Sequence, residues 1–161
     1  HVFSEANAAL EAVHDIARAS PRIDALFFGG VDMAAELRCK NAWEPLLYAR
    51  SRVAHAAASE GLDAIDVPYL DLEDSDGMRR EAELVRDLGF SGKGSIHPKQ
   101  IAILNDVFTP DAATIAYAQR ILRAFEEADT GLVVVDGKLI EKPVLREMRR
   151  ILSIAGRINQ I

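Results

Sequence analysis

The feature that most constrains this chain is a series of four short apolar runs, each followed by an amphipathic segment. The runs are centred near Phe3, Leu26, Ile65 and Ile96, so successive centres are 23, 39 and 31 residues apart. Parallel strands need crossover connections of a dozen or more residues, usually a helix, and each of these spacings has room for one. The pattern therefore predicts an α/β fold with a parallel sheet buried on both faces.

The pattern of apolar residues also predicts where the elements lie and where the chain divides. We expect strands at 2–3, 23–28, 64–67 and 94–96, and helices over about 10–17, 43–60, 76–88 and 98–108. Beyond Pro110 the pattern changes to a helix capped by Asp111, a hairpin that turns at Asp136-Gly137, and a last helix opened by Pro143. The chain thus divides into an α/β part, 1–108, and an appended part, 109–161.

Composition argues against several classes of protein. With 19 Lys and Arg against 25 Asp and Glu, the net charge of −6 disfavours a nucleic-acid groove or a polybasic membrane anchor. No apolar run approaches the roughly 20 residues of a membrane helix, and the N-terminus lacks the pattern of a secretory leader. The single cysteine, Cys39, cannot form an intramolecular disulfide. We therefore expect a cytoplasmic protein with no nucleic-acid or membrane partner.

Two carboxylates occupy the places where an α/β fold binds ligands, the carboxyl ends of its strands. Glu5 follows the first run, and Asp32 follows the second behind Gly29-Gly30-Val31. Carboxylates at one edge of a sheet could hold Mg²⁺, and Gly29, Gly30 and Val31 could bind substrate because glycines permit close approach to the backbone. The alternative is that each acid caps the helix that follows it. Spacing alone leaves both interpretations open.

Other polar residues carry weaker signals. His97 follows a loop with two glycines and a lysine that could receive an anion, but a helix N-cap is the simpler interpretation. Asp76-Gly77 is typical of a turn and a cap, and Ser75 has no histidine and acid spaced for a nucleophile. Cys39 lies between two basic residues but has no histidine partner.

Several motifs occur together in a characteristic order along nearly the whole chain. They are Glu5-Ala6-Asn7-Ala8-Ala9-Leu10, Phe28-Gly29-Gly30-Val31-Asp32-Met33, Ala49-Arg50-Ser51, Ala64-Ile65-Asp66, the block from Gly89-Phe90 through Gly92-Lys93 to His97-Pro98-Lys99-Gln100-Ile101, and Asp136-Gly137-Lys138-Leu139-Ile140. In these the chain resembles the citrate lyase beta-chain family of acyl-CoA lyases, within the HpcH/HpaI aldolase superfamily. The block that ends in His-Pro-x-Gln-Ile is the most specific of the motifs.

The resemblance implies a fold and a metal site. Members of the family are TIM (β/α)8 barrels, which need roughly 250 residues. The 161 residues here correspond to strands five to eight plus a C-terminal extension, 109–161, that packs on a neighbouring subunit of a trimer or hexamer. The family's Mg²⁺ ligands fall on Glu5 and Asp32. Its substrate-binding arginine belongs to the first half of the barrel, so it is absent from this sequence.

The resemblance also implies an activity, the Mg²⁺-dependent cleavage of a 3-hydroxyacyl-CoA to acetyl-CoA and a 2-oxo acid. Citramalyl-CoA, malyl-CoA and a citryl thioester are the candidate substrates. Relatives use an aspartate of the extension as acid/base, and here Glu141 holds that position. A second departure is Ala6, where many relatives carry Ser or Thr. The alternatives are a class II 2-oxo-acid aldolase that acts without coenzyme A, and a non-catalytic subunit or fragment.

Overall fold

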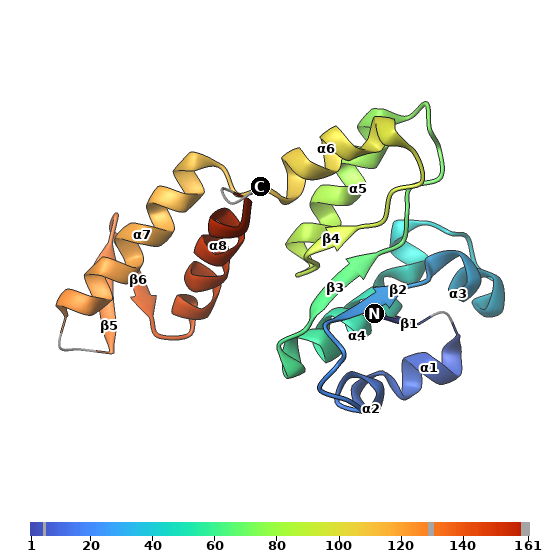
Figure 1. Ribbon diagram of the computed structural model, residues 1–161, viewed down its shortest axis with the longest axis horizontal. Helices are drawn as coiled ribbons and strands as arrows, with labels where there is room; N and C mark the ends of the chain where they lie inside the picture. Colours follow the sequence, from blue (N-terminus) through green and yellow to red (C-terminus); the bar gives the residue numbers. More distant parts are fainter. Residues whose placement is uncertain (5, 129–130, 159–161) are drawn as a thin grey trace. The chain divides into compact units, whose positions relative to one another are not determined.

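The computed structural model describes residues 1–4, 6–128 and 131–158, with the side chains of 3, 4, 157 and 158 left aside (Figure 1). The chain forms two compact units, His1–Phe108 and Thr109–Ile161. Each unit has its own cluster of buried apolar side chains, so each is described by itself. Among the described residues, no helix is both long and apolar enough to cross a membrane.

The first unit is built on a parallel four-stranded sheet in which each strand pairs with the next one along the chain. The strands are β1 (Val2–Ser4), β2 (Ala25–Phe28), β3 (Asp63–Asp66) and β4 (Gly92–Lys93), in the order β1-β2-β3-β4. The predicted parallel α/β sheet is thereby confirmed. The strand expected at 94–96 is misplaced, because Gly92 pairs with Ile65 and the chain leaves the sheet before Ile96, which is 53% exposed.

Six helices follow these strands in the described part of this unit. They are α1 (Asn7–Glu11), α2 (Val13–Ala17), α3 (Gly30–Leu37), α4 (Trp43–Glu60), α5 (Ser75–Asp87) and α6 (Pro98–Phe108). The helix expected over 10–17 is two short helices, α1 and α2, that meet at Ala12. The prediction for α4 is confirmed, and Gly61 ends it in the left-handed conformation that glycine adopts readily.

One face of the sheet packs against helices and the other carries partly exposed side chains. Leu26 and Phe28 of β2 share a face with Ala64 and Asp66 of β3, and all four are buried. On the opposite face Phe27 is paired with Ile65, and both are only half-buried. On that face Ala25 is buried as well, so among the described residues the predicted burial of both faces is complete on one face and partial on the other.

The second unit has the helix, hairpin and helix that the sequence predicts. These are α7 (Ala112–Glu127), β5 (Leu132–Val135), β6 (Lys138–Glu141) and α8 (Val144–Ile158). Asp111 caps α7 by accepting a 2.7 Å hydrogen bond from the Thr114 backbone N–H, which lowers the pKa of that carboxyl. Asp136 and Gly137 have φ of +50° and +74°, as a two-residue hairpin turn requires.

Candidate active site

Asp32 lies just beyond the carboxyl end of β2, in the first turn of α3 (Figure 1). Its side chain is exposed, and no described residue forms a hydrogen bond or ion pair with its carboxylate. The residue that caps α3 is Gly29, whose carbonyl accepts from the Met33 N–H at 3.1 Å. The interpretation of Asp32 as an N-cap is therefore wrong, since the helix begins two residues before it. Its oxygens remain available to a hard cation.

The turn before Asp32 is held in place by close packing at Gly30. A Cβ at this position would lie 2.9 Å from Val67 Cγ1 and 3.0 Å from Phe28 Cε1. Packing thus explains the need for glycine at Gly30, which is buried, whereas Val31 is 43% exposed. Substrate binding by Gly29, Gly30 and Val31 stays a prediction, and the structure places all three in one turn with Asp32.

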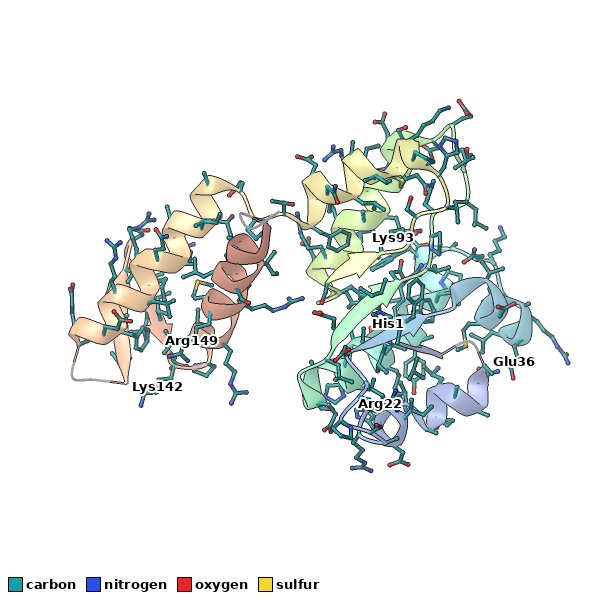
Figure 2. All side chains as sticks on the ribbon, in the orientation of Figure 1. His1, Arg22, Glu36, Lys93, Lys142 and Arg149 are labelled. Carbon is teal, nitrogen blue, oxygen red and sulfur yellow. The ribbon has the colours of Figure 1, made fainter. Side chains whose placement is uncertain are left out.

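The second predicted metal ligand, Glu5, lies outside the described residues, so its role as ligand or cap stays a prediction. The segments on either side of it are described. Ser4 pairs with Phe28, so the carboxyl ends of β1 and β2 meet at one edge of the sheet. One helical turn beyond Asp32, Glu36 accepts a 2.8 Å hydrogen bond from the Asn7 N–H (Figure 2). Glu36 therefore ties the start of α1 to the helix that carries Asp32.

The loops that follow β3 and β4 are joined by one buried side chain, Gln100, which is 3% exposed. Its Nε2 donates to the Tyr69 carbonyl at 2.8 Å, and its Oε1 accepts from the Ile96 N–H at 2.9 Å and the Ser95 hydroxyl at 3.2 Å. His97 Nδ1 accepts from the Lys99 N–H at 3.1 Å, so the interpretation of His97 as a cap of α6 is confirmed.

The N-terminus of α5 is capped by Asp74 rather than by Asp76, contrary to the expectation from sequence. Asp74 accepts from the Gly77 N–H at 2.8 Å and from the Tyr69 hydroxyl at 2.9 Å. These two hydrogen bonds lower the pKa of Asp74, the backbone donor having the larger effect. The bond to Asp74 raises the pKa of Tyr69 to about 12, because a phenolate could not donate it.

A network of buried charged residues lies at the carboxyl ends of β3 and β4, and the sequence prediction missed it. Arg50 Nε contacts Asp66 Oδ1 at 2.9 Å. Lys93, which is labelled in Figure 2, contacts Asp66 Oδ2 and Glu81 Oε1 with its Nζ, both at 2.6 Å. The side chains of Arg50, Asp66 and Lys93 are 1%, 0% and 0% exposed. A signal for it exists in the sequence, since Arg50 falls on the apolar side of the predicted helix 43–60.

Glu141 belongs to the second unit, so its grouping with Asp32 stays a prediction. It ends β6 directly opposite Leu132 of β5, and Val134 pairs with Leu139 on the same face of the hairpin. These three apolar side chains are 50%, 68% and 59% exposed. The exposed face of the hairpin is therefore an apolar surface with one carboxylate.

An open depression of about 440 Å³ lies in the same unit, with Phe125, Leu145 and Lys142 among the residues that line it.

The described residues fit a magnesium site supplied by few protein ligands. No group of three or more His, Cys, Asp or Glu side chains is gathered among them, and Glu5 is not one of the residues described. Mg²⁺ is commonly held by one or two carboxylates, with water and substrate oxygens completing its coordination. An exposed Asp32 at the carboxyl end of a parallel strand, unpaired within the described part of the chain, suits that mode of binding.

Comparison with known proteins places the chain in a family. Residues 2–98 match the model of the HpcH/HpaI aldolase/citrate lyase family. The chain is 32% identical to the citrate lyase subunit beta of Leuconostoc mesenteroides subsp. cremoris, over 97% of this chain and 54% of that protein. It is 34% identical to the mitochondrial citramalyl-CoA lyase of Rattus norvegicus, over 86% of this chain and 42% of the relative. The chain thus spans about half the length of the curated relatives it matches.

Solved structures agree with this placement. RipC from Yersinia pestis is 44% identical, with a TM-score of 0.69 over 70% of this chain and 53% of that one. CitE from Mycobacterium tuberculosis, solved in complex with magnesium, acetoacetate and coenzyme A, is 27% identical. Its TM-score is 0.79 over 96% of this chain and 60% of CitE. The likeness to CitE therefore extends over both units.

Proposed function

Because the chain belongs to the HpcH/HpaI aldolase/citrate lyase family, we propose that it is the C-terminal half of a Mg²⁺-dependent carbon–carbon lyase. In this proposal β1 to β4 are strands five to eight of a (β/α)8 barrel, and residues 109–161 are an extension that packs on a neighbouring subunit. The consecutive strand order supports the barrel, because a doubly wound sheet reverses its order at a switch point. The half-buried Phe27 and Ile65 would then face the interior of the barrel.

The proposed substrate is a 3-hydroxyacyl-CoA such as citramalyl-CoA or malyl-CoA, or a citryl thioester. Relatives named citrate lyase subunit beta, citramalyl-CoA lyase and L-malyl-CoA/beta-methylmalyl-CoA lyase support this class of substrate. In the reaction the substrate hydroxyl loses its proton and becomes the carbonyl of a 2-oxo acid. The electron pair of the broken carbon–carbon bond passes to the acetyl thioester, whose α-carbon takes up a proton.

The observation that carries the proposal is the position of Asp32 behind the Gly29–Gly30 turn, where it is exposed and has no partner among the residues that the structure describes. Asp32 and Glu5 would hold Mg²⁺, and the turn from Gly29 to Val31 would lie along the bound substrate. Mg²⁺ bound there supplies Lewis-acid chemistry, which stabilises negative charge on substrate oxygens. The chain's own contribution is to hold Asp32 at a fixed place, since Gly30 is packed against Val67 and Phe28.

Glu141 would donate the proton to the α-carbon of the thioester, in the active site of a neighbouring subunit. It stands at the edge of the apolar surface formed by Leu132, Val134 and Leu139, which is exposed within its own unit. Packing this surface against another subunit would bury three large apolar side chains and bring the carboxyl group with them. Glutamate is one methylene longer than the family's aspartate, so the backbone of β6 would sit slightly farther from the substrate.

The test of the metal site compares two aspartates at equivalent places in successive strand–helix units. Asp32 is in the first turn of α3, and Asp76 is in the first turn of α5. In the intact protein, Asp32→Asn should abolish Mg²⁺-dependent release of acetyl-CoA from citramalyl-CoA or malyl-CoA, whereas Asp76→Asn should retain it. Activity of Asp32→Asn after chelation and return of Mg²⁺ would show that the ligand is assigned wrongly.

The test of Glu141 separates turnover from binding. Glu141→Gln should lower kcat far more than it changes KM, because an acid that acts only in the transition state contributes little to substrate binding. Glu147→Gln, an exposed acid in the first turn of α8, is the matched control. Equal effects of Glu141→Gln on kcat and KM would indicate that the residue packs rather than transfers a proton.

A wild-type protein that cleaves none of the citramalyl, malyl or citryl thioesters would refute the lyase proposal. Aldol chemistry on pyruvate that needs no coenzyme A would assign the protein to the class II aldolases of the same family. Binding of a second protein without either activity would instead indicate a non-catalytic subunit.

A further inference from the structure

The buried arginine Arg50 connects two parts of the first unit that the mechanism requires to be fixed together. From α4 it reaches the end of β3, where its Nε and Nη2 lie 2.9 and 3.5 Å from the two oxygens of Asp66. From the same place its guanidinium covers aromatic rings, with its central carbon 5.2 Å from the centroid of Phe28 and 5.2 Å from that of Trp43. Arg50 therefore links the charge of β3 to an aromatic side chain of β2.

The contact with the two rings is specific to a planar guanidinium. Arg50 Nη1 is buried and has no hydrogen-bond acceptor among the described residues. A flat, weakly hydrated cation can lie against an aromatic face, whereas a lysine ammonium is compact and strongly hydrated. The guanidinium of Arg50 is thus stabilised by packing against the two rings as well as by its hydrogen bonds to Asp66.

Phe28 extends this contact to the turn from Gly29 to Val31, which precedes Asp32. It is 0% exposed, and its Cε1 would lie 3.0 Å from a Cβ placed on Gly30, which shows how closely the ring meets the first residue of α3. Asp32 is two residues farther along the same turn of helix. The contacts therefore run without a gap from Asp66 through Arg50, Phe28 and Gly30 to the segment that carries Asp32.

We propose that Arg50 is a positioning residue for the metal site, which it influences by holding Phe28 against the turn that carries Asp32. The proposal rests on the proposed function, since it assumes that Asp32 binds Mg²⁺. It assigns to Arg50 a role different from that of Lys93. Lys93 joins the same network through Asp66 and Glu81, so it stabilises the same carboxylate without supporting Phe28 in this way.

The experiment measures Mg²⁺ affinity by titration calorimetry in the intact protein, together with the urea midpoint of unfolding. Arg50→Met should weaken Mg²⁺ binding about tenfold, at the lower end of the range for residues that orient metal ligands. Phe28→Leu should weaken it to a similar extent. Lys93→Met is the matched control, because it removes a buried cation from the same carboxylate. It should lower the urea midpoint while changing Mg²⁺ affinity less than about twofold.

Two further variants separate positioning from general loss of structure. In Arg50→Met/Phe28→Leu the losses of affinity should be less than additive, since both residues act along one path. Arg50→Lys keeps a cation beside Asp66, so its urea midpoint should stay closer to wild type although its Mg²⁺ affinity still falls.

Equal losses of affinity in Arg50→Met and Lys93→Met, or fully additive losses in the double variant, would overturn the inference. So would unchanged Mg²⁺ affinity in Arg50→Lys and Arg50→Met. A wild-type protein that binds no Mg²⁺ would instead refute the proposed function, and the role of Arg50 with it. The two failures are thus told apart by the wild-type titration alone.

Discussion

Removing the carboxylate of Asp66 should be among the most destabilising single changes in the first unit. In Asp66→Ala the cations of Arg50 and Lys93, whose side chains are 1% and 0% exposed, retain Glu81 as their one anionic partner among the described residues. Glu81 Oε1 lies 2.6 Å from Lys93 Nζ but 3.9 Å from Arg50 Nη2, so the arginine is the less well compensated. Removing one partner of a buried ion pair typically costs about 3–5 kcal/mol, which is our expected loss.

An exposed ion pair of the same unit provides the matched control. Arg79 and Asp106 lie 2.6 Å apart, as close as Lys93 and Asp66, but their side chains are 41% and 66% exposed. Pairs of this kind contribute about 0–1 kcal/mol, so Asp106→Ala should change stability little. The assay is urea denaturation of the intact protein, in which the free energies of unfolding are compared between variants whose m-values equal that of the wild type.

Two results would refute this reasoning. A loss in Asp66→Ala no larger than the loss in Asp106→Ala would show that burial does not govern the strength of the pair. The second test is the replacement of Arg50, Asp66 and Lys93 together by apolar residues of similar volume, which should recover most of the lost stability because no unpaired charge remains buried. If the triple variant is as unstable as Asp66→Ala, the cost does not come from uncompensated charge.

Three further changes test other contacts near the site. Glu36→Ala removes the acceptor of the Asn7 N–H and should weaken Mg²⁺ binding, measured by calorimetry, whereas Glu36→Gln keeps an acceptor and should bind nearly as wild type. Gly30→Ala forces a methyl group into an occupied space and should cost roughly 1–3 kcal/mol of unfolding free energy in urea. The pKa of Asp74 is lowered in the folded protein, first of all by the hydrogen bond from the Gly77 N–H. The ionised form of Asp74 therefore stabilises the fold above the unfolded pKa of 3.8, and this stabilisation is lost as the pH falls through the pKa of the folded state. The difference in unfolding free energy between wild type and Asp74→Asn should therefore shrink between about pH 7 and about pH 3.

The strands, helices and hairpin were largely predictable because local patterns determine them. The apolar runs specify β1 to β3, and the Asp136-Gly137 turn needs positive φ at both positions, which the structure shows. The strand at 94–96 was misplaced because hydrophobicity points to Ile96, whereas hydrogen bonding with β3 selects Gly92–Lys93. Pairing between strands is a tertiary choice that no short run of residues encodes.

The position of Asp32 was predictable from the sequence, but the contacts that hold its surroundings in place were not. The place of Asp32 beyond β2 follows from strand periodicity and from the rule that ligands bind at carboxyl ends of strands. The network around Asp66 joins residues from α4, β3, α5 and β4, which are far apart in sequence. Arg50 gave a local sign of it, as a charged residue on the apolar side of a helix. Which anion it meets depends on the sheet register.

The neighbour-to-neighbour order of the sheet has a consequence for how the first unit is synthesised. From β2 onward, each strand pairs with the one that left the ribosome just before it, across gaps of a few tens of residues. Contacts between sequence neighbours close short loops, which favours rapid folding, and units can be added one by one as translation proceeds. Until the next unit arrives, the newest strand offers an open edge to other chains. Slowing translation between β3 and β4 should therefore increase aggregation of the nascent protein.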